Sequence, residues 1–307
     1  MEKRKIKYAS SDSKTWIHAV MWIPEEKARG VILFSHGVTE NAERHEELAK
    51  YFTERGFVVA ANDHLGHGNS YNGKENKMFF DFWQYLVLDF KSLYDIVKDE
   101  YKDLPVFVIG FSMGSFVARD FANLYSQKLA GAVYIGTGYQ PKMVTKAMRK
   151  IVDMYGKKHG MNKPSDFIQK LAFGTYNDKI KNHKTDFDWI CADEAALADY
   201  IADPNVRKFV TPGLFREMLQ GIENTCDPTN MLGMTRRMPI LLMSGSEDPV
   251  GDNTKGVKKL AKIFRDEAMR DVTELFYPGA RHDILNEGGV KVKVYYDLEN
   301  WIEERMQ

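Results

Sequence analysis

The fold is decided by residues 104–115, which read LPVFVIGFSMGS. A mainly apolar run, 105–109, precedes the string GFSMG, and helix-forming residues follow it. A G-x-S-x-G string alone is a weak signal. Between a buried strand and a helix it is typical of a sharp turn that raises a serine hydroxyl above the end of a sheet. The pattern predicts Ser112 as a nucleophile, with Gly110 and Gly114 shaping its turn; the alternative is a glycine-rich turn with a capping serine.

Strand patterns and helix patterns alternate on both sides of this stretch. The strand-like runs are nearly continuous in hydrophobicity, as expected of strands buried on both faces, and they cover 29–37, 56–64, 104–112 and 129–136. Apolar residues at helical spacing in 43–55 and 79–101 predict helices between them. An antiparallel edge is expected from 5–9 and 15–22. The order predicts an α/β fold with a mostly parallel, doubly wound sheet.

The alternation stops near Thr137 and resumes at Met238. The interval has helical patterns interrupted by proline and glycine. We therefore expect a core made of residues 1–136 and 238–307, and a mainly helical cap, or lid, made of residues 137–237.

The serine needs a base that removes its proton and a carboxylate that orients this base. In such a sheet they are expected after later strands, in the order Ser, Asp, His. Asp248 and His282 each follow a strand-like run, and no other histidine lies beyond Asp248. Glu247 and Asp252 are rival carboxylates, and a plain Asp-Pro turn and a plain loop histidine are the non-catalytic alternatives. The predicted catalytic residues are Ser112, Asp248 and His282.

Acyl transfer also requires fixed backbone N–H donors around the developing oxyanion. Met113, directly after the serine, is one predicted donor. Val38, in the loop after the first buried strand, is the other. His36 and Gly37 are expected to shape this loop; the alternative for His36 is a second catalytic base.

Composition excludes several classes of protein. The 307 residues include 43 Lys plus Arg and 43 Asp plus Glu, so the basic excess of a nucleic-acid binder is absent and no nucleic acid is expected as a partner. No apolar run approaches the ~20 residues of a membrane span, and no secretory signal is visible. A soluble, cytoplasmic protein is expected.

Metal and cofactor sites are not predicted. Two cysteines provide neither a disulfide framework nor metal-ligand spacing. Asp63, His64 and His67 stand close together, but they lie in a glycine-rich turn without further ligands and without a dinucleotide-binding motif.

Four stretches together resemble the monoacylglycerol lipase and lysophospholipase branch of the α/β-hydrolase fold, which is related to the serine aminopeptidase-like hydrolases. They are 35–70, IGFSMGS (109–115), SGSEDPVG (244–251) and GARHDILNE (279–287). The resemblance implies the same triad and the same oxyanion donors, and a cap that shapes an acyl pocket. Asn41 stands where monoacylglycerol lipases usually have histidine, which puts their preference for glycerol esters in doubt.

We expect a cofactor-free serine hydrolase that cleaves carboxylic esters of acyl lipids, of the monoacylglycerol or lysophospholipid type, through an acyl-enzyme. Its expected partner is a small-molecule acyl ester. The first alternative is an aminopeptidase or amidase with the same triad. That enzyme would need a pocket carboxylate for the substrate amine, with Glu194, Glu217 and Glu223 as candidates. The second alternative is a non-catalytic ligand-binding protein.

The cap carries two opposite charge runs. Residues 139–163 contain seven Lys or Arg and one acid, with apolar residues at helical spacing, which predicts a basic amphipathic helix. Residues 186–203 contain six acids and no Lys or Arg, so we expect the two runs to pair within the cap; the alternative is that the basic helix contacts anionic lipid. The methionines and aromatic residues of the cap are candidates for an acyl pocket; the alternative is that they fill the core.

Overall fold

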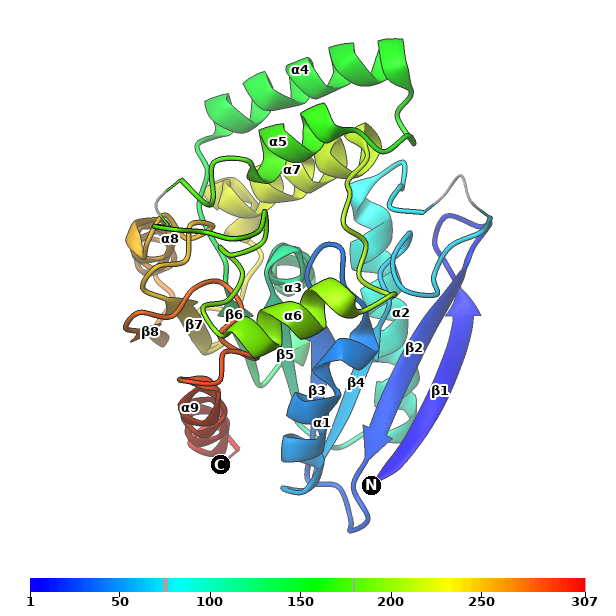
Figure 1. The fold of residues 1–307 in the computed structure, drawn as a ribbon. Helices are drawn as coiled ribbons and strands as arrows, with labels where there is room; N and C mark the ends of the chain where they lie inside the picture. The colour runs from blue at the N-terminus through cyan, green and yellow to red at the C-terminus, as the bar shows by residue number, and fades with distance from the viewer. Residues whose placement is uncertain (74–76, 179, 307) are drawn as a thin grey trace.

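The computed structural model describes residues 1–73, 77–178 and 180–306, and these form an eight-stranded sheet with helices on both faces (Figure 1). The strands are β1 (Glu2–Ala9), β2 (Trp16–Ile23), β3 (Gly30–Ser35), β4 (Phe57–Asn62), β5 (Val106–Phe111), β6 (Gly131–Ile135), β7 (Ile240–Gly245) and β8 (Val272–Tyr277). Their order in the sheet is β1-β2-β4-β3-β5-β6-β7-β8. The β1–β2 and β2–β4 pairs are antiparallel and the other pairs are parallel, which confirms the predicted fold class.

The central strands are buried throughout because helices cover both of their faces. Every residue of β3, β4, β5, β6 and β7 is buried, as expected of parallel strands between two helical layers. The core helices are α1 (Glu46–Thr53), α2 (Trp83–Glu100), α3 (Met113–Tyr125), α8 (Lys255–Asp266) and α9 (Lys291–Glu303). The core also contains the short 3₁₀ helices η1 (Ala42–His45) and η3 (Ser126–Lys128).

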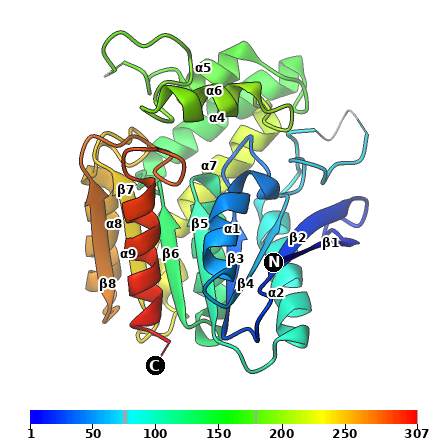
Figure 2. The same cartoon turned by 60° about the horizontal axis from the view of Figure 1, so that its bottom comes forward.

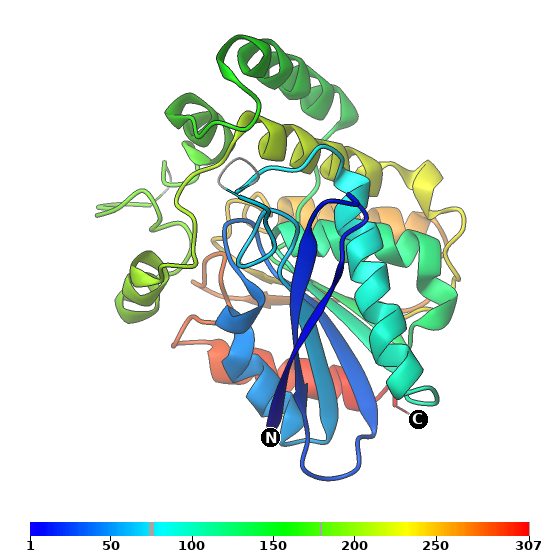
Figure 3. The ribbon, with the colours of Figure 1, turned by 90° about the vertical axis from the view of Figure 1, so that its right-hand side faces the viewer.

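Two hydrophobic cores lie on opposite faces of the sheet. One contains the apolar sides of α1 and α9, and the other contains those of α2, α3 and α8 (Figure 3). The chain therefore crosses from face to face between strands, and all parallel strands end at the same edge of the sheet.

Residues 137–237, the segment expected to form the cap, leave the sheet after β6 and return to it at β7. Its helices are α4 (Lys142–His159), α5 (Asp166–Phe173), α6 (Glu194–Ala202), α7 (Pro212–Cys226) and the turn η4 (Pro228–Met231). Figure 2 shows them grouped over the edge where the parallel strands end. The cap helix α7 contacts both α4 and the core helix α3, so it connects the outer cap to the core.

A buried guanidinium on a core helix connects the entry to the cap with the end of α7. Arg119 on α3 is 2% exposed. It donates to the carbonyl of Gly138, at the entry to the cap, at 3.1 Å, and to that of Thr225, at the end of α7, at 2.6 Å. Among the described residues, no helix is both long enough and apolar enough to cross a membrane.

Candidate active site

Ser112 lies on a strained turn between β5 and α3. Its φ of 53° and ψ of −122° fall outside the regions that side-chain-bearing residues normally adopt. A Cβ on Gly110 would collide with the carbonyl of Gly114, and a Cβ on Gly114 would collide with the carbonyl of Ser35. Both flanking glycines are therefore required for the turn that raises the serine hydroxyl at the end of the sheet, as the sequence predicted.

Three predicted residues from distant parts of the chain meet at this turn. His282 Nε2 lies 2.8 Å from Ser112 Oγ, and His282 Nδ1 lies 2.9 Å from Asp248 Oδ1. Asp248 is fully buried and also accepts from the N–H of Val250. The imidazole thus connects hydroxyl and carboxylate in the geometry of a nucleophile, a base and an orienting acid. The rival carboxylates Glu247 and Asp252 do not occupy the position of Asp248.

The electrostatic environment favours the protonated form of the histidine. Burial by itself lowers the pKa of His282, but the charge of Asp248 and its hydrogen bond, with contributions from Asp283 and Glu40, raise this pKa above its ordinary value. A positive charge on His282 is therefore stabilised, as a base that accepts a proton from serine requires.

The loop after β3 lies directly against the serine turn. Gly37 packs on Ser112, where a Cβ would come within 3.2 Å of the serine Cβ, and Val38 lines the cavity beside the hydroxyl. Met113 is the first residue of α3, where a helix leaves its backbone N–H without an intrahelical partner. Both predicted oxyanion donors thus flank Ser112.

His36 has no hydrogen bond to the catalytic residues. Its Nδ1–H donates to the carbonyl of Gly37 at 2.7 Å and its Nε2 accepts from the N–H of His64 at 3.0 Å. Burial and neighbouring histidines hold the pKa of His36 well below its ordinary value, so it stays neutral. These bonds join two loops at the edge of the sheet, which favours loop shaping over catalysis.

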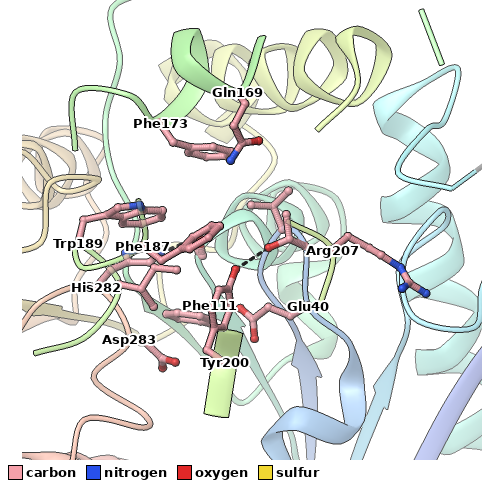
Figure 4. Close-up of a pocket in the computed structure, with 14 residues that line it drawn as sticks. Glu40, Phe111, Gln169, Phe173, Phe187, Trp189, Tyr200, Arg207, His282 and Asp283 are labelled. Carbon is pink, nitrogen blue, oxygen red and sulfur yellow. Dashed lines mark hydrogen bonds between the residues drawn. The ribbon is translucent and has the colours of Figure 1, made fainter. Parts of the chain in front are cut away.

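A cavity of about 30 Å³ lies over Ser112, between the core and residues of the cap (Figure 4). Its cap side is aromatic, with Phe173, Phe187, Trp189 and Tyr200. No methionine is among the described lining residues. Instead, cap methionines such as Met218 and Met234 fill the core, so the aromatic part of the predicted pocket is present and the methionine part is not.

Several charged or polar residues beside the cavity, Arg207 and Gln169 among them, were not predicted as site residues. The carboxylates of Glu40 and Asp283 line it, and the guanidinium of Arg44 lies between them, 3.6 Å from Glu40 Oε2 and 3.3 Å from Asp283 Oδ2. His45 Nε2 lies 2.9 Å from the same Glu40 oxygen. Glu40, Arg44 and His45 belong to the stretch that carried the family resemblance, and Asp283 follows His282, but no spacing rule indicates that they converge.

The cap glutamates considered as holders of a substrate amine do not line the cavity. Glu194 pairs with Lys184, whereas Glu217 accepts from the backbone N–H of Trp83 and pairs with Arg216. Glu223 pairs with Lys146 and Arg149. These candidates are wrong because each carboxylate already faces a cation or a helix N-terminus elsewhere in the cap.

The histidines of the glycine-rich turn take part in loop contacts. Asp63 accepts from the N–H groups of Ala42 and Asn69, and His67 Nδ1–H donates to the carbonyl of Leu65. Among the described residues, no group of three or more His, Cys, Asp or Glu side chains is placed to hold a metal ion.

Comparisons with known proteins identify the family of this chain and several similar proteins. Residues 26–289 match the model of the family described as serine aminopeptidase, S33. A monoacylglycerol lipase of Mycolicibacterium smegmatis is 28% identical over 291 residues, which cover 92% of this chain and 91% of that protein. The human monoglyceride lipase is 26% identical over 293 residues, covering 92% and 86% of the two chains. A thermostable carboxyl esterase from Bacillus coagulans, solved in complex with glycerol, has a TM-score of 0.92, 26% identity and full coverage of both chains.

The protein is a carboxylic ester hydrolase with the α/β-hydrolase fold. The chain belongs to the serine aminopeptidase S33 family and is similar to monoacylglycerol lipases, which confirms the resemblance predicted from its motifs.

Proposed function

We propose that the protein hydrolyses carboxylic esters of acyl lipids, and that Ser112, His282 and Asp248 carry out the reaction. The observation that carries this proposal is the continuous hydrogen-bond chain of 2.8 and 2.9 Å at the end of the sheet, under an aromatic cap. Residues 137–237 act as one cap subdomain over the site.

The mechanism follows from the positions of these groups. His282 Nε2 takes the proton of the Ser112 hydroxyl while the serine oxygen attacks the ester carbonyl. The N–H groups of Val38 and Met113 stabilise the oxyanion that forms. The imidazolium, held by Asp248, then protonates the leaving alcohol, which leaves an acyl group on the serine. A water molecule, deprotonated by His282, attacks this acyl-enzyme and releases the acid.

The alcohol group of the substrate would meet charges of both signs. Glu40, Asp283 and Arg207 line the cavity, and the guanidinium of Arg44 pairs with both carboxylates. Asn41, the departure from the family pattern, does not line the cavity; its side chain caps η1 through the N–H of Arg44. We propose monoacylglycerol-type esters as substrates, ahead of lysophospholipids, because the chain is similar over most of its length to monoacylglycerol lipases.

The Ser112→Ala substitution tests the assignment. We expect turnover of p-nitrophenyl esters to fall by about 10⁴-fold or more, with loss of labelling by a fluorophosphonate probe. Ser92→Ala, on the core helix α2, serves as the matched control and should keep both. Retained turnover in Ser112→Ala would reject the mechanism. A higher rate on aminoacyl naphthylamides than on acyl esters would instead favour the amidase alternative.

We also propose that the cap contacts an anionic lipid surface through α4. On the outer side of this helix Met143 is 85% exposed and Met154 is 74% exposed. Lys150, Lys157 and Lys158 form no ion pair in the part of the chain that the structure describes. Exposed apolar side chains among lysines match a surface with acyl chains and anionic head groups.

The expected pairing between the two charge runs of the cap is not found among the ion pairs of the described residues. Lys142 pairs with Asp227, and Lys146 and Arg149 pair with Glu223. Both acids lie outside residues 186–203. The lysines on the outer side of α4 are therefore available to a partner of opposite charge.

A further inference from the structure

Residues 187–192, which we call the aromatic segment, form the wall of the cap beside His282. The segment is irregular and lies between α5 and α6. The ring of Trp189 lies 5.1 Å from that of His282 and stacks on Phe173 at 5.8 Å, measured between centroids. Phe187 contacts the ring of Tyr200 across the cavity (Figure 4). Together these rings fill the space over Ser112.

The remaining space is too small for a fatty acyl chain. The cavity of about 30 Å³ holds one or two water molecules, whereas sites for small organic ligands occupy about 300–1,000 Å³. An acetyl group fits beside Ser112, but a longer acyl chain has to displace the aromatic segment. The free energy needed to displace the aromatic segment therefore adds to the activation free energy for long-chain esters, and not to that for acetyl esters.

A single side chain holds both ends of the aromatic segment. Arg281, directly before His282, donates from Nη1 to the carbonyl of Asp188 at 2.7 Å and to that of Cys191 at 3.1 Å. Because the segment is irregular, these carbonyls have no strand or helix partner. A charged donor is the strong kind of hydrogen-bond partner for such a group.

The rest of the His282 loop adds backbone and carboxylate contacts to the same segment. The N–H of Asp283 donates to the carbonyl of Ile190 at 2.7 Å. The carboxylate of Glu287 accepts from Ala192 N–H at 3.2 Å and from the backbone N–H of Arg281 at 3.1 Å. The aromatic segment is thus bonded to the loop that carries the general base.

We infer that Arg281 is a positioning residue that sets the acyl-chain preference: it holds the aromatic segment closed over Ser112 and opposes entry of long chains. The inference rests on the proposed ester hydrolysis at Ser112. Removal of the Arg281 side chain lowers the free energy needed to displace the aromatic segment, and so speeds hydrolysis of octanoyl esters. Acetyl esters do not displace the segment, so their rate of hydrolysis does not change.

The test compares kcat/KM of the wild type and Arg281→Met on p-nitrophenyl acetate and p-nitrophenyl octanoate, normalised to active sites titrated with a fluorophosphonate. We expect the octanoate-to-acetate ratio to rise by at least about tenfold, because loss of even one of the two hydrogen bonds from this charged donor has an effect of that size. The rise should come mainly from a lower KM for octanoate. Arg281→Lys, which keeps a charged donor, should give a smaller rise.

Arg236→Met is the matched control, because Arg236 also donates to a backbone carbonyl, that of Met231, but lies away from the cavity. Its ratio should stay that of the wild type. An unchanged or lower ratio in Arg281→Met, or a parallel fall on both esters, overturns the inference. If Arg281→Met fails to fold, the ratio in Arg281→Lys decides. A wild type that neither hydrolyses esters nor reacts with the probe would contradict the proposed function instead.

Discussion

At the scale of single residues, the site depends on charges that the sequence places far apart. Asp248, Asp283 and Glu40 all raise the pKa of His282, although only Asp248 is hydrogen-bonded to it. The imidazole must be neutral to accept the proton of Ser112. The acid limb of the pH profile of kcat/KM therefore reports the pKa that these carboxylates set.

The Asp283→Asn substitution should move this acid limb to lower pH. Removing a negative charge near His282 destabilises its protonated form and lowers its pKa, so the neutral base persists to lower pH. The measurement is kcat/KM for p-nitrophenyl acetate between pH 4.5 and pH 9. Asp186→Asn, on the exposed part of the cap, should leave the limb in place. A limb that does not move, or that moves to higher pH, would contradict the electrostatic role of Asp283.

At the scale of elements, α4 has two different sides. One side pairs with carboxylates at the end of α7, through Lys142 and Lys146. The outer side presents methionines and lysines to solvent. A helix whose basic residues only balanced the charge of the cap would not leave large apolar side chains exposed beside them.

Reversing the charges of Lys150, Lys157 and Lys158 to Glu should abolish sedimentation with vesicles of phosphatidylglycerol and phosphatidylcholine. At about 1 kcal/mol for each lysine near the surface, the loss exceeds about a hundredfold in affinity. Wild-type binding should weaken with added salt, and turnover of soluble esters should not change. Charge reversal of Lys255, Lys258 and Lys259 on α8 is the matched control and should keep binding. Vesicles that never bind the wild type, or that bind both variants equally, would reject the lipid contact.

At the scale of the whole molecule, Arg119 connects core and cap. Its buried guanidinium donates to carbonyls at the entry to the cap and at the end of α7. Without these donors two buried carbonyls lose their partners.

The Arg119→Met substitution should lower the free energy of unfolding by about 3 kcal/mol, since each unpaired buried carbonyl costs about 1–3 kcal/mol and the removed charge offsets part of it. Urea denaturation followed by circular dichroism measures this loss. Arg265→Met also removes a donor to a carbonyl, that of Val272, but at an exposed position. There the loss should stay below about 1 kcal/mol. Equal losses in both variants would show that Arg119 has no special role in joining cap and core.

The sequence by itself determined the features that depend on local pattern. Continuous apolar runs predicted the parallel strands, because a strand buried on both faces has no polar side. The glycines around Ser112 and the positions of Asp248 and His282 after strands predicted which residues would meet, since parallel strands bring their ends to one edge of the sheet.

Only the tertiary structure decided what surrounds that site. Glu40, Arg44 and Asp283 converge because the β3 loop and the loop after β8 are adjacent in space, which no spacing in the chain reveals. The closure of the cavity by residues 187–192 likewise depends on how the cap packs on the His282 loop. The equal and opposite charges of residues 139–163 and 186–203 predicted ion pairs between these two runs, but the basic residues pair with Asp227 and Glu223 instead. Ion pairs form between side chains that packing brings together, and the charge balance along the chain does not determine which these are.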